Sequence, residues 1–274
     1  MYKVHDITDS SRKLAMKVCK ESANFDFEIK AMQAIHRKTS RDFKNVQKHF
    51  TTPEVISHGK LVCLDNNVIR DGRVSHIELR ESQTFSFVIM PRYSLNLDQY
   101  FDSENSKFSK ATTFYIGFSV LQLLEQVHRA GYIFNDLKPD NLITIMDNSV
   151  DIKKSSNVYA QLKINLIDFG FATQFMEFDK DNRVKHCEPE ELENFRGNII
   201  FASPNQLDFM STSRRDDLIS LCYMIIYFLT GGNIPGVESL AKDYKDLYKE
   251  IAVTRKTQTV EDICNEKLGT QELY

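Results

Sequence analysis

Four polar residues in the middle of the chain have the types and the spacing that phosphate chemistry needs. Asp136 is followed by Lys138 two positions later and by Asn141 five positions later, and Asp168 comes after a further apolar stretch. Carboxylate and amide oxygens are ligands that Mg²⁺ prefers, together with phosphate oxygens. Asp136 would accept the proton of an attacking hydroxyl, and Lys138 would lie beside the phosphate as a point charge.

The sequence around these residues matches the catalytic and metal-binding motifs of protein kinases. Residues 132–142 are YIFNDLKPDNL, and the apolar run before Asp168 leads directly into Asp168-Phe169-Gly170. A lone D-F-G occurs by chance in many proteins, but the two motifs in this order, between a helix and short strands, are specific. The pattern predicts Asp136 and Lys138 as catalytic residues, and Asn141 and Asp168 as ligands of nucleotide and metal.

A second lysine lies near the start of the chain. Leu14-Ala15-Met16-Lys17 matches the strand motif V-A-I-K, which predicts that Lys17 binds the α- and β-phosphates of ATP. Glu28, on the helix expected next, is its natural ion-pair partner. The alternative is a surface lysine and a solvated glutamate. The downstream motifs favour the ion pair.

Two further runs extend the comparison. Ser213-Arg214-Arg215-Asp216-Asp217-Leu218 and Ala202-Ser203-Pro204-Asn205 resemble motifs of the casein kinase 1 family of serine/threonine protein kinases. That family has S-R-R-D-D-L at its central helix and A-S-I-N in place of A-P-E. The resemblance extends from Met1 to about Cys264. It implies a serine/threonine kinase that uses ATP and Mg²⁺ and acts on protein substrates.

The resemblance also implies roles for residues outside the catalytic motifs. Met90 corresponds to the gatekeeper, and Pro91–Tyr93 to the hinge that binds adenine, so Tyr93 joins Lys17 and Glu28 among the expected nucleotide-binding residues. Asp217 corresponds to the helix-start aspartate that holds the backbone of the catalytic loop.

The expected fold class is α+β, a two-lobed protein-kinase-like fold in one domain over residues 1–274. The small strand-rich lobe would span residues 1–90, the hinge 91–93 and the larger, mainly helical lobe 94–274. Periodicity and turn residues predict the N-terminal elements. These are strands at Tyr2–Ile7, Lys13–Val18, Glu54–His58 and Phe85–Met90, a helix at Phe25–His36 and a long loop at Asp65–Ser82.

The larger lobe is expected to be built on two long helices. Thr112–Ala130 would turn Phe114, Phe118, Leu121 and Val127 to the core and be capped by Gly131. Arg215–Thr230 is apolar nearly all round, which predicts a buried helix ended by Gly231-Gly232. The remaining predictions are strands at Leu142–Ile145 and Leu162–Ile167 and a helix at Lys242–Ala252.

Several positions depart from the kinase pattern. The first glycine is Gly59, so we expect the first strand and the glycine-rich loop to be missing, and the chain ends before the last helices expected of a large lobe. The usual H-R-D is Phe134-Asn135-Asp136. Phe134 can replace the histidine as a packing residue. Loss of the arginine should cost little, because casein kinase 1 enzymes do not rely on activation-loop phosphorylation.

Other departures concern substrates. Ile200 and Leu240 stand where relatives have basic side chains that bind a phosphate or acidic residues of the substrate, and an apolar side chain cannot do this. We therefore do not expect a preference for primed substrates. The acidic run 188–193 is interpreted as a solvated charge run, with a pseudosubstrate as the alternative. The insert Asp147–Ala160 is interpreted as a surface hairpin, with a partner-binding element as the alternative.

Composition limits the remaining classes of function. The 274 residues are 42% hydrophobic and 27% charged, with 35 basic and 38 acidic side chains and a net charge of -3, which argues against nucleic acid as a partner. Neither an 18-residue apolar stretch nor a signal peptide is found, so we expect no membrane insertion and an intracellular site, with cytoplasm, nucleus and cytoskeleton not separable. Five scattered cysteines indicate neither a disulfide framework nor a zinc site.

Three hypotheses for the function follow. The chain is an active kinase, a pseudokinase that serves as a scaffolding subunit of a larger assembly, or a regulatory module that binds nucleotide without transferring phosphate. The active kinase is favoured because all six polar positions of the chemistry are present. These are Lys17, Glu28, Asp136, Lys138, Asn141 and Asp168.

Overall fold

Four antiparallel strands form the sheet of the N-terminal lobe in the computed structural model. In the order β1-β2-β4-β3, strand β2 (Lys13–Lys20) lies between β1 (Tyr2–His5) and β4 (Gln83–Pro91), and β3 (Ser57–Cys63) is the far edge. The register places Lys17 of β2 opposite Val88 of β4. The structure describes residues 2–5, 9, 12–20, 22–42, 53–63, 83–93, 95–145, 163–178, 184–234 and 243–268.

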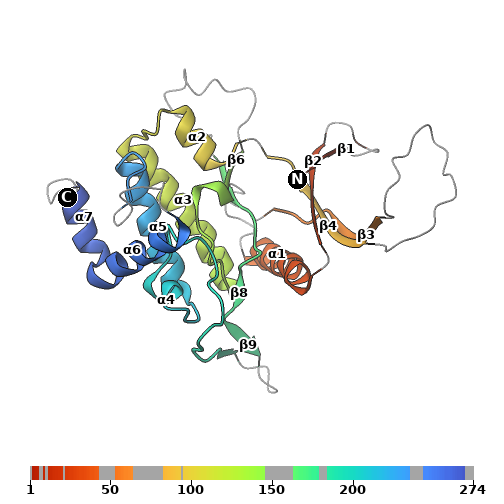
Figure 1. The fold of residues 1–274 in the computed structure, drawn as a ribbon. Coiled ribbons are helices and arrows are strands. Elements are labelled where there is room, and N and C mark those ends of the chain that lie inside the picture. Colours follow the sequence, from red (N-terminus) through yellow and green to blue (C-terminus); the bar gives the residue numbers. More distant parts are fainter. Residues whose placement is uncertain are drawn as a thin grey trace.

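Helix α1 (Ala23–Asp42) packs against this sheet, between it and the helical lobe (Figure 1). Phe25, Ile29, Met32 and Ile35 are buried at the three- and four-residue spacing of one helix face. Glu28 lies on the same face and is also buried, although it is charged. A buried carboxylate needs a polar or charged partner, so Glu28 must find one within the core.

The larger lobe is mainly helical, which confirms the predicted α+β fold with a small strand-rich lobe. Its centre is α3 (Lys110–Arg129) packed against α5 (Arg214–Leu229). The other helices are α2 (Leu97–Ser103), the one-turn η1 (Pro139–Asn141), α4 (Pro204–Leu207), α6 (Tyr244–Thr257) and α7 (Val260–Leu268). Short antiparallel pairs join β5 (Tyr132–Ile133) to β8 (Thr173–Gln174), β6 (Leu142–Ile145) to β7 (Lys163–Leu166), and β9 (Met176–Phe178) to β10 (Val184–His186).

The core face predicted for α3 is wrong at three of its four named residues. Phe114, Phe118 and Leu121 are 52%, 59% and 43% exposed, whereas Val127 is fully buried. The buried face is built instead by Ile116, Val120, Leu123, Leu124 and Val127. Residues two apart on a helix point in nearly opposite directions, so the aromatic stripe and the aliphatic stripe could not both face α5.

Other boundaries differ modestly from the predictions. Strand β3 begins at Ser57 rather than at Glu54, and Pro91 still belongs to β4, where it pairs with Leu14. Helices α2 and α7 were not predicted, because seven and nine residues are too short for a clear helical period. The predicted loop Asp65–Ser82 and the insert Asp147–Ala160 lie outside the described residues.

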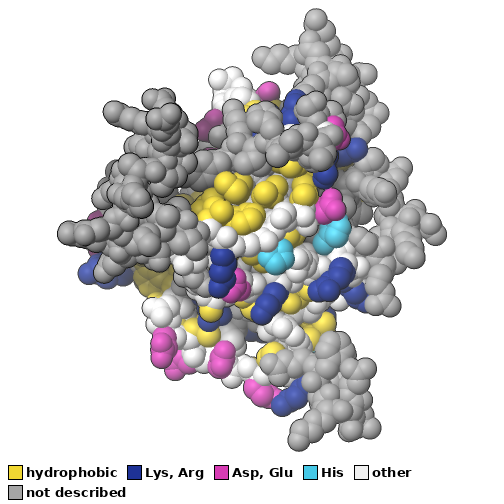
Figure 2. Space-filling view, turned by 90° about the vertical axis from the view of Figure 1, so that its right-hand side faces the viewer, with side chains coloured by type: hydrophobic (Ala, Val, Ile, Leu, Met, Phe, Trp, Pro, Cys, Tyr) yellow, Lys and Arg dark blue, Asp and Glu magenta, His cyan; other side chains and the backbone are white. Residues whose placement is uncertain are grey.

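The surface of the strand-rich lobe combines apolar and charged side chains. Figure 2 shows an area of hydrophobic side chains on this side of the molecule, with basic, acidic and histidine side chains beside it. Within the described ranges, no helix is both long and apolar enough to cross a bilayer.

Phe101 on α2 tests the packing of the helical lobe. It is fully buried, and its ring contacts Phe108, Tyr227 and Phe228 with centroid distances of 4.9, 5.3 and 5.1 Å. We expect Phe101→Ala to lower the free energy of unfolding by about 3–5 kcal/mol, because the cavity removes these contacts. Phe114→Ala is the matched control, and it should change the free energy by less than about 0.5 kcal/mol. Urea denaturation of both variants measures the difference, and equal losses would contradict the described core.

Candidate active site

Lys17 is held between two carboxylates from different parts of the chain. Its ammonium donates to Glu28 Oε1 at 2.8 Å and to Oε2 at 3.0 Å, and to Asp168 Oδ1 at 2.8 Å. Strand β2, helix α1 and the D-F-G motif after β7 therefore meet at one nitrogen. The predicted Lys17–Glu28 ion pair is present, and Asp168 is added to it.

The pKa values of this cluster show what holds it. Burial alone would lower the pKa of Lys17, but the negative charges of Glu28 and Asp168 outweigh it and raise that pKa above its usual value. Burial raises the pKa of Glu28, against the opposing effect of Lys17. The Glu28 carboxylate also accepts a hydrogen bond from the backbone N–H of Phe169. The α1 helix is thus tied to the D-F-G motif by backbone as well as by charge.

Asp136 and Lys138 lie in the loop that connects β5 to η1, and Asn141 is the last residue of η1. Lys138 Nζ lies 2.9 Å from Asp136 Oδ2, and Asn141 Nδ2 donates to the same oxygen and to the Asp136 backbone carbonyl, each at 2.8 Å. Pro139 begins η1 and helps to turn the loop so that Asn141 reaches back to Asp136. The spacing of two and five residues therefore places the side chains of Lys138 and Asn141 at the Asp136 carboxylate.

The Asp136 carboxylate is buried but only partly satisfied. Its side chain is 2% exposed, and Oδ1 has no hydrogen-bond partner in the part of the chain that the structure describes. Burial raises the pKa of Asp136; Lys138 and Asn141 oppose this, and the charge of Asp168 adds to it. An unpaired carboxylate oxygen with a raised pKa is suited to accept a proton from a bound hydroxyl.

Asp217, at the start of α5, holds the backbone that precedes Asp136. Its Oδ2 accepts from the Phe134 N–H at 2.9 Å, and its Oδ1 accepts from the Asn135 N–H at 2.9 Å. His128 Nε2, near the end of α3, lies 2.8 Å from Oδ2. The interpretation of Asp217 as a structural aspartate is confirmed by these contacts. The contribution of His128 was not predicted.

Phe134 packs where the kinase motif has histidine. It is fully buried, and its ring stands edge-on to that of Phe169 at 5.2 Å between centroids. The contact joins the catalytic loop to the D-F-G motif through apolar surface alone. The prediction that Phe134 acts as a packing residue is therefore confirmed.

Residues around the start of α5 form a polar support that the sequence did not reveal. Asp216 Oδ1 accepts from Ser203 Oγ at 2.8 Å and from Asn205 Nδ2 at 3.0 Å. Ser203 also caps α4, together with Gln206. The two adjacent aspartates of the S-R-R-D-D-L motif thus bind two different segments of the chain. Asp217 fixes the catalytic loop, and Asp216 fixes the segment before α4.

Met90 and Tyr93 lie at the end of β4 and just beyond it. Met90 is 5% exposed and belongs to the main hydrophobic core. The Tyr93 side chain is hydrogen-bonded to Asn165 of β7, and burial raises its pKa to about 12. Its phenol thus links the region after β4 to the β6–β7 hairpin. Because the Tyr93 hydroxyl is engaged with Asn165, its backbone is the group left for a polar contact to adenine.

The two positions considered for substrate phosphate differ in what the structure describes. Ile200 is partly buried against the core, and its carbonyl accepts from the Arg255 guanidinium at 3.1 Å. Arg255 is itself buried and lies 3.4 Å from the ring centroid of Tyr223, and burial lowers its pKa to about 10. An apolar side chain at Ile200 provides no charge for an anion. Leu240 lies outside the described residues.

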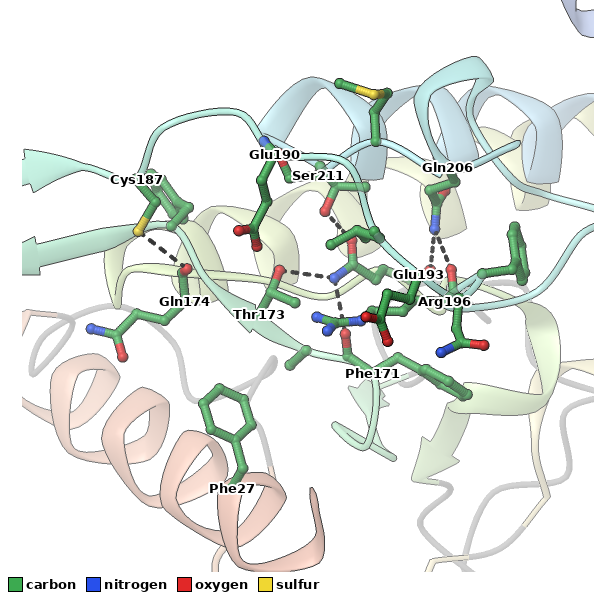
Figure 3. Close-up of a pocket in the computed structure, with 18 of the residues that line it drawn as sticks. Phe27, Phe171, Thr173, Gln174, Cys187, Glu190, Glu193, Arg196, Gln206 and Ser211 are labelled. Carbon is green, nitrogen blue, oxygen red and sulfur yellow. Dashed lines mark hydrogen bonds between the residues drawn. The ribbon is translucent and has the colours of Figure 1, made fainter. Parts of the chain in front are cut away.

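The acidic run lines one side of an open cavity of about 970 Å³ between α1, the residues after the D-F-G motif and the approach to α5 (Figure 3). The run is held in an extended form: Ser211 N–H donates to the Glu190 carbonyl, and Leu192 N–H donates to the Phe209 carbonyl. All four glutamate side chains are exposed, as expected of a solvated charge run. They are Glu188, Glu190, Glu191 and Glu193.

The chain belongs to the protein kinase domain family, which it matches over residues 10–271. The match covers both lobes and every residue of the site described above. Family membership implies ATP and protein substrates for a phosphotransferase, typically with Mg²⁺.

The residues present fit a magnesium–nucleotide complex. Asp168 keeps 44% of its side chain exposed while Oδ1 binds Lys17, and Asn141 uses its Nδ2 on Asp136, so the amide oxygen remains for a cation. In the described ranges, no group of three or more histidine, cysteine or acidic side chains could hold a metal ion. Such a site therefore needs phosphate oxygens to complete it, as is usual for Mg²⁺ bound with nucleotide.

Asp217→Asn tests the support of the catalytic loop. The amide keeps the shape of the carboxylate, but its Nδ2 cannot accept from a backbone N–H. We expect the free energy of unfolding to fall by about 1–3 kcal/mol for the donor left unpaired. Asp246→Asn on α6, where the side chain is 61% exposed, is the control. Chemical denaturation measures both, and equal stability of the two variants would refute the role of Asp217.

Proposed function

We propose that the chain is an ATP- and Mg²⁺-dependent serine/threonine protein kinase of casein kinase 1 type. The observation that carries the proposal is the joint assembly of two clusters. Lys17, Glu28 and Asp168 form one, and Asp136, Lys138 and Asn141 form the other. Burial raises the pKa of Asp136, and the charge of Asp168 adds to that rise, which supports the two clusters acting on one substrate complex.

The roles of these residues follow from their positions. Lys17 would neutralise charge on the α- and β-phosphates, with Glu28 holding it in place. Asn141 and Asp168 would hold Mg²⁺, which neutralises charge on the phosphate oxygens. Met90 and Tyr93 would border the adenine.

Asp136 would orient the acceptor hydroxyl and take its proton at Oδ1. As the hydroxyl oxygen bonds to the γ-phosphorus, the bond from that phosphorus to the bridging oxygen of ADP breaks. Lys138 would lie beside the transferred phosphoryl group as a fixed positive charge. Substrate choice would not depend on a phosphate at Ile200, because that side chain is apolar.

A catalytically inactive scaffold is the second candidate. Phe114, Phe118 and Leu121 form an exposed apolar stripe on α3, at spacings of four and three residues. Exposed apolar patches often mark protein–protein contacts. This stripe favours a binding role in a larger assembly. A binding role alone does not decide between a kinase that transfers phosphate and an inactive scaffold.

Transfer of labelled γ-phosphate from ATP to casein with Mg²⁺ tests the proposal. We expect transfer by the unmodified chain and a loss of at least about 100-fold in Asp168→Asn, because one charged ligand is removed where charge develops. Asp102→Asn, an exposed change on α2, should transfer phosphate at the unmodified rate.

Failure would be informative in two ways. No transfer and no rise of the thermal midpoint with Mg-ATP would overturn the kinase and favour the scaffold. A thermal shift without transfer would instead support a nucleotide-binding regulatory module.

The pH dependence of kcat/KM tests the assignment of Asp136. The site needs Asp136 ionised, so activity should fall as the pH drops through its raised pKa. Lys138 lowers that pKa, so Lys138→Met should raise it further and move the acid limb of the profile to higher pH. Lys138→Arg keeps a cation and should leave the limb near its original position. An acid limb that does not move in Lys138→Met would exclude Asp136 as the titrating group.

A further inference from the structure

Asn135, directly before Asp136, has every polar group engaged. The residue is 5% exposed, its N–H donates to Asp217, and its carbonyl accepts from Gln206 Nε2 at 2.8 Å. Its backbone has φ of +68°, a conformation that asparagine tolerates better than most residues. Because the backbone is fixed on both sides, the direction of the side chain is fixed as well.

The side chain of Asn135 joins three separate segments. Nδ2 donates to the Phe171 carbonyl at 2.9 Å and to Thr173 Oγ1 at 3.0 Å, and Oδ1 accepts from Thr212 Oγ1 at 2.5 Å. Figure 3 shows the bonds that reach Phe171 and Thr173 at the wall of the cavity. Phe171 and Thr173 follow the D-F-G motif, and Thr212 leads into α5. The neutral amide of Asn135 thus holds the catalytic loop against the residues after the D-F-G motif and against the residues that lead into α5.

Backbone contacts make the same connection. Thr173 of β8 pairs with Ile133 of β5, two residues before Asn135. Gly197 approaches from the other side with φ of +105°, and a Cβ there would lie 2.3 Å from the Asn135 carbonyl oxygen. The segment from Asp168 to Ser203, named here the activation segment, therefore contacts Asn135 at both of its ends.

The activation segment has few hydroxyl side chains that a regulatory kinase could phosphorylate. Between Asp168 and Ser203 the sequence holds one hydroxyl side chain, Thr173. The Thr173 hydroxyl already accepts from Asn135. Ser203 is fully buried and caps α4. Kinase activation loops are commonly ordered by a phosphate paired with arginine, but here the position before Asp136 has no cation.

The surroundings of Thr173 also oppose a phosphate. The same cavity is lined by Glu188, Glu190, Glu191 and Glu193, with Arg196 as the basic residue of the lining. A phosphate next to carboxylates is disfavoured by like-charge repulsion. Both hydrogens of the Asn135 amide are already used, so this side chain has no donor left for an anion.

We propose that Asn135 is the positioning residue that holds the activation segment in its assembled arrangement without phosphorylation. It acts through Asp136, whose backbone follows it, and through Phe171 and Thr173. The inference rests on the proposed kinase function for its effect on rate, but its effect on the activation segment does not require phosphoryl transfer.

Asn135→Asp is the sharpest test, since it keeps the shape but turns the donor Nδ2 into an oxygen that faces the Phe171 carbonyl. We expect kcat to fall by about tenfold to a hundredfold through misplacement of the loop, with little change of KM for ATP. Asn194→Asp adds the same charge at an exposed position in the activation segment and should leave kcat unchanged. Phosphatase treatment of the unmodified chain should also leave kcat unchanged.

Limited trypsin digestion provides a measurement that is independent of transfer. We expect cleavage at the exposed Lys185 and Arg196 to be about tenfold faster in Asn135→Asp than in Asn194→Asp, because local opening exposes the segment. Thr173→Val and Thr212→Val remove partners without altering Asn135, and each should give a smaller increase. These two variants decide the matter if Asn135→Asp fails to fold.

The two proposals fail differently. If the unmodified chain transfers no phosphate, the kinase function is overturned and the digestion rates alone decide the role of Asn135. Equal digestion rates in Asn135→Asp and Asn194→Asp, with Thr173→Val and Thr212→Val also unchanged, would overturn the positioning role. Loss of transfer after phosphatase treatment would overturn independence from phosphorylation.

Discussion

The buried carboxylate of Asp217 is the constraint on which the active site depends. It accepts hydrogen bonds from two consecutive backbone N–H groups, those of Phe134 and Asn135, and lies against His128. The side chain is 1% exposed, and these donors compensate for the contacts with water that burial removes. The N–H groups of Phe134 and Asn135 and the ring of His128 all bind this one carboxylate. Asp217 therefore connects α5, α3 and the catalytic loop immediately before Asp136.

From this anchor the two halves of the site are assembled by different forces. Charge brings the lobes together at Lys17, where Glu28 of α1 and Asp168 share one ammonium. Apolar contact brings the catalytic loop to the D-F-G motif, through the rings of Phe134 and Phe169. The Phe134–Phe169 contact involves no titratable group, whereas the Lys17 cluster is held by charged groups. The arrangement thus combines a fixed catalytic loop with a charge-dependent connection to the strand-rich lobe.

The neutral network around Asn135 completes this picture. Where an arginine would need an anion to be satisfied, an amide finds both acceptors and a donor within the chain. Thr173 carries the one hydroxyl between Asp168 and Ser203, and that hydroxyl is used in the network. In the proposed arrangement, the catalytic loop and the activation segment come together when the chain folds and need no added phosphate.

Local sequence determined the fold class, most strands and helices and all six charged or amide positions of the chemistry, because short motifs dictate the loops that carry them. The sequence predicts the Lys17–Glu28 ion pair, but only the tertiary structure places Asp168 at the same nitrogen. It also decided which face of α3 is buried: Phe114 and Phe118 are apolar, yet the aliphatic stripe packs on α5 instead. The long-range roles of Asn135, His128 and Asp216 could not be predicted from local sequence. The partners of Asn135 and His128 lie 36 to 89 positions away, and Asp216 bonds to Ser203 and Asn205, 13 and 11 positions away, in addition to capping its own helix at Ser213. Hydrogen bonds over such separations leave no periodic pattern in the sequence, and they exist only once the chain has closed on itself.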